Sequence, residues 1–254
     1  MRVFLKKIIQ LTLLLGVGIS TALWAQSDVT TFTLKNGLKV LVLEDHRSPV
    51  VASQIWYRIG GSYEKPGQSG KSHMLEHMMF KGTEAYPSGF ARKLIAENGG
   101  EENAFTSRDF TVYHQMLEAS RLEVVLKLEA DRMKNLKLDS EEFASERDVV
   151  IQERKWRIDD NPNRKFFERF SLAAYASSPY RQPLIGYQQD IERLTLDDLR
   201  QWYKTWYSPN NALLVIAGDV KPQAALALVK KHFGKIKPSK LPIHHRVDEI
   251  ESLG

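Results

Sequence analysis

Alternating hydrophobic and polar residues predict three β-strands near the start of the chain. Two such runs, in TTFTLKNGLKVLVLED, are joined by Asn36-Gly37, a dipeptide typical of tight hairpin turns. A third run, PVVASQIWYRIGGS, ends at Gly60-Gly61. We therefore expect a hairpin followed by a third strand.

Apolar residues at helical spacing replace this alternation near Ser72. A second short helix is expected in GFARKLIAEN, with Gly99-Gly100 as its stop signal. Asp139 is a typical N-cap residue and should begin another helix. The acidic residues that follow it would lie in the first turn, where the helix dipole favours negative charge. Since strands and helices are mixed without strict alternation, we expect an α+β fold. The other expected elements are strands at 102–106, 110–116 and in NALLVIAGD, and helices around 122–133, 166–176, 196–206 and 222–233.

The N-terminal pattern predicts a signal peptide over residues 1–25. Arg2, Lys6 and Lys7 precede an apolar run, and small residues stand near a plausible cleavage site after Ala25. The protein is therefore expected to be exported, to a periplasmic or other extracytoplasmic location. A membrane anchor formed by residues 8–25 is the alternative, although polar residues interrupt the run and it falls short of the about 20 residues that a span needs.

The expected order of strands and helices leaves no room for an internal boundary between residues 27 and 235, so we expect one domain there. Residues 236–254 are charged, contain proline and lack periodicity, which is typical of the start of an interdomain linker. We expect the second domain to be absent from this sequence.

Composition narrows the possible chemistry. With 43% hydrophobic residues in 254, the chain can bury a substantial core. The net charge of +5 falls to +2 without the three basic residues of the signal segment, so a nucleic-acid partner is not expected. There is no cysteine, which excludes thiolate catalysis, disulfides and cysteine-bound zinc. Any metal must be bound by His, Asp or Glu.

The segment GKSHMLEHMMFKGT, residues 70–83, carries the candidate metal chemistry. His73 and His77 are four residues apart, which places them on one helix face with about 5–6 Å between their Cβ atoms. Two imidazoles at this spacing can bind one Zn²⁺, and Glu76 projects from nearly the same side, within reach of a metal-bound water. The alternative is a core helix with two hydrogen-bonded histidines, but burying three polar groups without a partner is costly.

A catalytic zinc needs a third protein ligand from elsewhere in the chain. Glu146 and Glu153 are candidates because they lie two turns apart on one stripe of the helix that begins near Asp139. A solvated acidic face is the alternative.

Three motifs together carry a resemblance: HMLEHMMFKGT, ENGGEENAFTSRDFTVYH and ERDVVIQE. In this order they resemble the pitrilysin/insulinase-type zinc metallopeptidases, a family that includes the mitochondrial processing peptidase. The similarity extends from about Thr31 to the last helix. It implies an α+β half-domain in which a mixed, mostly antiparallel sheet packs with helices.

The resemblance also implies roles for individual residues. His73, His77 and Glu153 would bind one Zn²⁺ per chain, Glu76 would be the general base, and Glu146 would support the metal site from outside the ligand set. Asn103, Ala104, Phe105 and Thr106 would pair with a peptide substrate as an added strand. The implied function is a zinc-dependent endopeptidase that hydrolyses peptides or short unfolded segments.

Family members are typically built from two similar halves that close over the peptide, whereas this chain matches only the first. The expected partners besides peptide substrates are therefore a second half-domain or homologous subunit, or a second copy in a homodimer. The alternative function is a catalytically incomplete zinc-binding peptide clamp or subunit.

Overall fold

The computed structural model describes residues 29–243 and residue 250. The predicted signal peptide, with the alternative anchor, and most of residues 244–254 lie outside the described residues. Within the described part, no helix is both long and apolar enough to cross a membrane.

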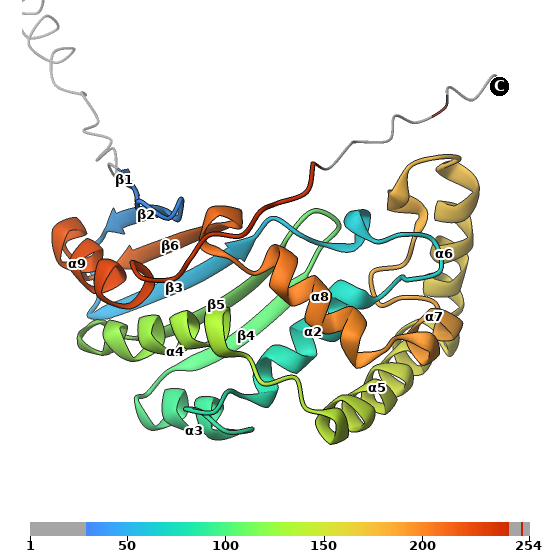
Figure 1. The fold of residues 1–254 in the computed structure, drawn as a ribbon, viewed down its shortest axis with the longest axis horizontal. Helices are drawn as coiled ribbons and strands as arrows, with labels where there is room; N and C mark the ends of the chain where they lie inside the picture. Colours follow the sequence, from blue (N-terminus) through green and yellow to red (C-terminus); the bar gives the residue numbers. More distant parts are fainter. Residues whose placement is uncertain (1–28, 244–249, 251–254) are drawn as a thin grey trace, which may run out of the picture.

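A six-stranded sheet forms the frame of the fold (Figure 1). Its strand order is β1-β2-β6-β3-β5-β4, and every neighbouring pair is antiparallel except β2 and β6. The predicted mixed, mostly antiparallel sheet is thus confirmed. The strands are β1 (Val29–Thr33), β2 (Lys39–Glu44), β3 (Val50–Tyr57), β4 (Glu101–Thr106), β5 (Thr111–Glu118) and β6 (Ala212–Gly218).

The predicted hairpin joins β1 to β2. Gly37 has a φ of 89°, a left-handed conformation that side-chain-bearing residues rarely adopt. Asn36 accepts a hydrogen bond from the amide of Leu38, and its Nδ2 donates to the carbonyl of Phe233 at 2.8 Å. The turn dipeptide therefore also ties the hairpin to the end of the last helix.

The helices lie mostly where periodicity predicted them. The unpredicted features include the six-residue helix α7, too short for a periodic signal, and a π-helical turn, η4, over Lys155–Asp159. The α-helices are α2 (Lys71–Met78), α3 (Phe90–Glu97), α4 (Leu122–Asn135), α5 (Ser140–Arg154), α6 (Pro162–Ala174), α7 (Gln188–Arg193), α8 (Leu196–Trp206) and α9 (Pro222–Phe233). Short 3-10 turns are η1 (Gly61–Tyr63), η2 (Met79–Lys81), η3 (Ala119–Arg121), η5 (Pro179–Arg181) and η6 (Pro209–Asn211).

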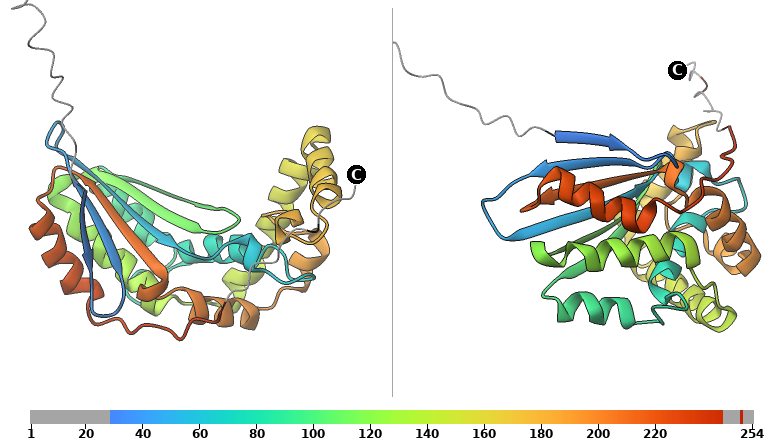
Figure 2. Two further views of the ribbon diagram at one scale, coloured as in Figure 1. Left: turned by 90° about the horizontal axis from the view of Figure 1, so that it is seen from above. Right: turned by 60° about the vertical axis from the view of Figure 1, so that its left-hand side comes forward.

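The helices form two groups around the sheet. Helix α4 packs on β3 and β5, and α9 packs on β2 and α4. Helix α2 contacts β4, α5 and α8, and so connects the sheet to the second group of helices. Figure 2 (left) shows the resulting concave shape, in which the sheet and α6 rise at the two ends of a floor that includes α2 and α8. The candidate site residues of α2 therefore lie between the sheet and α6.

Candidate functional site

Helix α2 is fixed in the floor by burial. Met74, Leu75 and Met78 are fully buried in the main core, so one face of this helix packs into the protein interior. Gly70 precedes the helix and has no side chain to cap it. Glu64 supplies the cap instead, accepting hydrogen bonds from the amides of Gly70 at 2.7 Å and Ser72 at 2.6 Å. This cap sets the position of the helix that carries both histidines.

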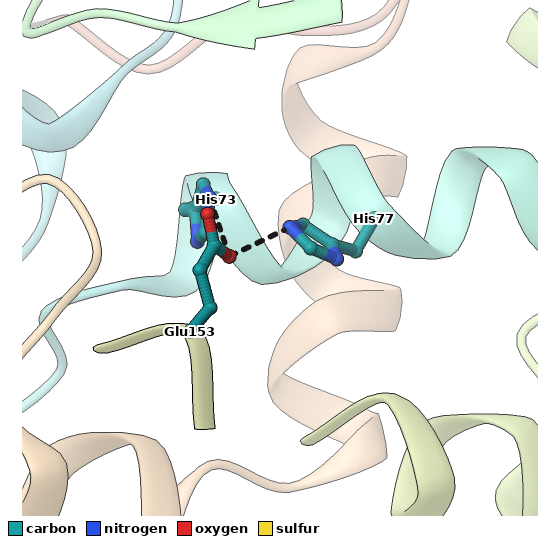
Figure 3. Close-up of side chains that lie close together, drawn as sticks. All are labelled: His73, His77 and Glu153. Carbon is teal, nitrogen blue, oxygen red and sulfur yellow. Dashed lines mark ion pairs between the residues drawn. The ribbon is translucent and has the colours of Figure 1, made fainter. Parts of the chain in front are cut away.

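His73 and His77 face Glu153, which comes from the last turn of α5 (Figure 3). Oε2 of Glu153 lies 3.6 Å from Nε2 of His73 and 3.3 Å from Nε2 of His77. One ligand atom from each residue lies within 4.8 Å of the other two. We call these three residues the candidate metal centre.

A buried carboxylate oxygen indicates that the candidate metal centre suits a cation. Oε2 of Glu153 forms no hydrogen bond within the described residues, although Nε2 of both His73 and His77 approaches it. Buried polar atoms without partners are rare, and each calls for an explanation such as an ion. Two imidazole nitrogens and one carboxylate oxygen are also a donor set of catalytic zinc sites, so the residues fit zinc.

Glu146 holds His77 from the other side of its ring. Its Oε1 lies 2.8 Å from Nδ1 of His77, the nitrogen that faces away from Glu153. Its second oxygen forms an ion pair with Lys81. A partner on the far nitrogen orients a ligating imidazole, which agrees with the supporting role expected of Glu146.

Burial and neighbouring charge shift the pKa values of these residues in opposite directions. Burial, with the charge of His77, lowers the pKa of His73 to about 4. Burial also acts to lower the pKa of His77, but its hydrogen bond to Glu146 and the charge of Glu153 outweigh it and raise the pKa to about 9. For Glu153, the close approach of His77 outweighs burial and lowers the pKa to about 2. The site therefore holds an ionised Glu153 at neutral pH.

Glu76 lies beside the candidate metal centre and contacts strand β4. It is 9% exposed, and it accepts a hydrogen bond from the hydroxyl of Thr106. Burial raises the pKa of Glu76, with the Thr106 hydrogen bond acting in the other direction. A carboxylate whose pKa is raised toward neutrality is suited to proton transfer.

Strand β4 borders the site as the last strand of the sheet, paired with β5 on one side. Its exposed residues alternate, with Asn103 and Phe105 facing outward and Ala104 and Thr106 half-buried toward the helices. The amide of Ala104 donates to the side chain of Asn103. All four residues named from the sequence therefore lie on a sheet edge next to Glu76.

A cleft of about 940 Å³ joins these parts. It contains the candidate metal centre, Glu76 and residues 103–106, and its far wall is formed by η4, α6 and the segment 181–185. Sequence reasoning missed the far wall, which includes Trp156, Arg164, Phe167 and Arg181, and missed Arg108, which reaches it from the β4–β5 connection and contacts Tyr180. Only the i, i+3 spacing of Arg164 and Phe167 on one helix could have indicated a shared face.

Two family models match the sequence. The model described as Insulinase (Peptidase family M16) matches residues 39–188, more than half of the chain. The model described as Peptidase M16 inactive domain matches residues 193–252.

Similar proteins include a zinc protease, PqqE, from Helicobacter pylori, 36% identical over 236 residues. The match covers 91% of this chain and 53% of that protein, so the chain spans about half the length of this relative. A crystal structure of a protease from Helicobacter pylori aligns with a TM-score of 0.84 at 36% identity, covering 87% of this chain and 54% of the other. The periplasmic protease PqqL from Escherichia coli aligns with a TM-score of 0.81 at 25% identity, covering 88% and 26%.

Proposed function

We propose that this chain, which belongs to the insulinase family (peptidase family M16), is the metal-bearing half of a zinc-dependent endopeptidase. The observation that carries the proposal is the convergence of His73, His77 and Glu153, with a buried Glu153 oxygen that forms no hydrogen bond, beside a buried Glu76. The relatives named as proteases support the same reading.

His73, His77 and Glu153 would hold one Zn²⁺, with Glu146 and Lys81 supporting His77. When bound, zinc supplies Lewis-acid chemistry, polarising the scissile carbonyl and lowering the pKa of water to about 7. Glu76 would accept the proton of the attacking water, as a general base, and then donate it to the leaving amine. The raised pKa of Glu76 supports this role because it eases return of the proton. The hydrogen bond from the Thr106 hydroxyl supports it because it holds the carboxyl group at the end of β4.

The substrate would bind as an extended strand along β4. Residues Asn103 to Thr106 lie on an edge strand and line the same cleft as Glu76, so main-chain hydrogen bonds there would place a peptide bond near the candidate metal centre. This arrangement favours peptides and short unfolded segments over folded proteins, because a strand must be free to pair.

We further propose that a second half-domain, a homologous subunit or a second copy completes the enzyme. The chain spans 53% of the Helicobacter pylori relative, which supports an enzyme about twice the length of the part described here. An extracytoplasmic location is supported by the N-terminal pattern and by the periplasmic relative PqqL.

The test uses the zinc-loaded chain and a quenched fluorogenic peptide, with and without a candidate second half. We expect bound zinc in a metal assay, cleavage of the peptide, and loss of cleavage when a chelator removes the metal. A chain that binds zinc and protects the peptide from other proteases, yet never cleaves it in either mixture, would instead be a peptide clamp.

A further inference from the structure

The far wall of the cleft carries arginines that the proposed mechanism does not use. Residues 161, 164, 167 and 171 of the α6 segment line the cleft at helical spacing, so one face of this helix points toward the candidate metal centre. Arg164 comes from this face, Arg108 from the β4–β5 connection and Arg181 from the end of η5. We call these three residues the arginine wall.

Within the described residues, no ion pair joins Arg108, Arg164 or Arg181 to an acidic side chain. The lining residue Glu168 is already neutralised, because Arg154 binds both of its oxygens at 2.9 Å. The three positive charges of the arginine wall therefore face the cleft without a carboxylate partner in the part of the chain that the structure describes.

Two of the three guanidinium groups are held in place by carbonyl groups. Arg108 donates to the carbonyl of Tyr180, and its Cζ lies 5.1 Å from the centre of the Tyr180 ring. Arg181 donates to the carbonyl of Ala176 at 2.8 Å. Carbonyl contacts fix a guanidinium without cancelling its charge, so further donors stay available for an anionic ligand.

Exposed aromatic side chains line the same cleft as these charges. Trp156 on η4 is 74% exposed and Phe167 on α6 is 60% exposed. Their rings offer apolar surface to the side chains of a bound peptide. The wall is thus suited to an anionic group attached to an extended peptide.

We propose that the arginine wall binds a carboxylate of the substrate, so that the chain prefers peptides with an Asp or Glu side chain, or a free C-terminal carboxylate, near the scissile bond. This inference rests on the proposed function and names its substrate class. Guanidinium and carboxylate match in geometry and charge, and their hydrogen bonds are among the stronger ones in proteins. The cleft is large for a ligand pocket and can hold several residues of a peptide.

The experiment measures binding and cleavage separately. A set of labelled peptides carries one Glu at successive positions around the cleavage site, each paired with a Gln peptide, and each made with a free or an amidated C-terminus. Binding to the zinc-loaded Glu76→Gln variant is followed by fluorescence anisotropy, and kcat/KM is measured with the active chain. We expect one position, or the free C-terminus, to bind about tenfold more tightly than its neutral counterpart.

Charge reversal identifies the residues responsible. Arg164→Glu and Arg181→Glu should each abolish the preference and improve binding of the matching Lys peptide. Arg169→Glu is the matched control, because Arg169 lies on the same helix but does not line the cleft. A Glu-to-Gln affinity ratio near one at every position and at both C-termini would overturn the inference even if peptides are cleaved. A clear carboxylate preference in binding without any cleavage would support the inference and overturn the proposed peptidase.

Discussion

The candidate metal centre and the arginine wall face each other across one cleft, but they are built differently. In the candidate metal centre the side chains are 10–21% exposed and surrounded by charged neighbours on α2 and α5. In the wall, Arg164 is exposed and contacts no acidic residue within the described part of the chain. The first region is preorganised by the protein itself, whereas the second depends on a ligand for its partners. We therefore expect substitutions in the candidate metal centre to abolish catalysis and substitutions in the arginine wall to alter the substrate preference.

The largest effect is expected from Glu76, beside the candidate metal centre, and it tests whether catalysis depends on this region. Glu76→Gln should lower kcat by about 10²–10⁴-fold, because the amide cannot accept the proton that the carboxylate takes. Zinc content should stay unchanged, since Glu76 is not among the three residues of the candidate metal centre. Peptide cleavage and a zinc assay on the same purified protein check both expectations. A variant that cleaves at the wild-type rate would remove Glu76 from the role of base.

Glu64, which caps the helix that carries both histidines, should make the stability of the protein depend on pH. Burial raises the pKa of Glu64 to about 7, outweighing its hydrogen bonds from the helix amides. Folding thus favours protonated Glu64, a stabilising contribution that is complete below about pH 4.5 and lost as the pH rises through about 7. In this window the free energy of unfolding should fall by up to about 1.4 kcal/mol per pH unit on account of Glu64.

Glu64→Gln isolates that contribution, because glutamine does not titrate. Urea unfolding of the wild type and the variant between pH 4.5 and 8 should show a difference in stability that changes with pH, while the other titrating groups cancel. Parallel pH profiles for the two proteins would mean that Glu64 does not titrate in this range and that the cap contributes no pH dependence.

Sequence reasoning predicted what is local in this molecule. The i, i+4 histidines, the turn at Asn36-Gly37 and the Asp139 cap are short-range signals, and the structure has a helix, a hairpin and a capped helix at these places. The side chain of Asp139 accepts from the amides of Glu141 and Glu142 as expected. Glu153 was harder, because its distance from His73 is set by the packing of α5 on α2. The resemblance supplied it, and its role as a ligand stays a prediction.

The arginine wall could not be predicted because it is assembled from three separate segments. Arg108, Arg164 and Arg181 share no spacing, and exposed arginines are common on any protein surface. The cap by Glu64 was missed for a similar reason, since a loop residue reaches back over the start of α2. The packing of distant segments determines where such side chains lie, and a local sequence pattern does not predict that packing.

A smaller effect is expected from Glu146, which contacts His77 but is not one of the three residues of the candidate metal centre. Glu146→Gln should weaken zinc binding by about 10–100-fold, because it removes the carboxylate that holds Nδ1 of His77. Glu142→Gln is the control, since Glu142 is on the same helix as Glu146 and its Oε2 lies 3.6 Å from Nζ of Lys81. Among the described residues, no ion pair joins Glu142 to His73 or His77. Competition with a fluorescent zinc chelator measures both affinities. Equal affinities for the two variants would show that Glu146 does not orient His77.

The smallest effect is expected on α6 outside the cleft, at a residue that does not line it. Phe170 on α6 is 55% exposed and contacts Phe166, with ring centres 6.2 Å apart. Phe170→Ala should lower the free energy of unfolding by less than about 1 kcal/mol, since an exposed aromatic pair contributes little beyond its small buried area. Phe143→Ala, in the core at 6% exposure, should cost about 3–5 kcal/mol by comparison. Urea unfolding at several protein concentrations provides the measurement. A large, concentration-dependent loss for Phe170→Ala would contradict this expectation, because it would mean that a second copy covers the face of α6 that carries Phe166 and Phe170.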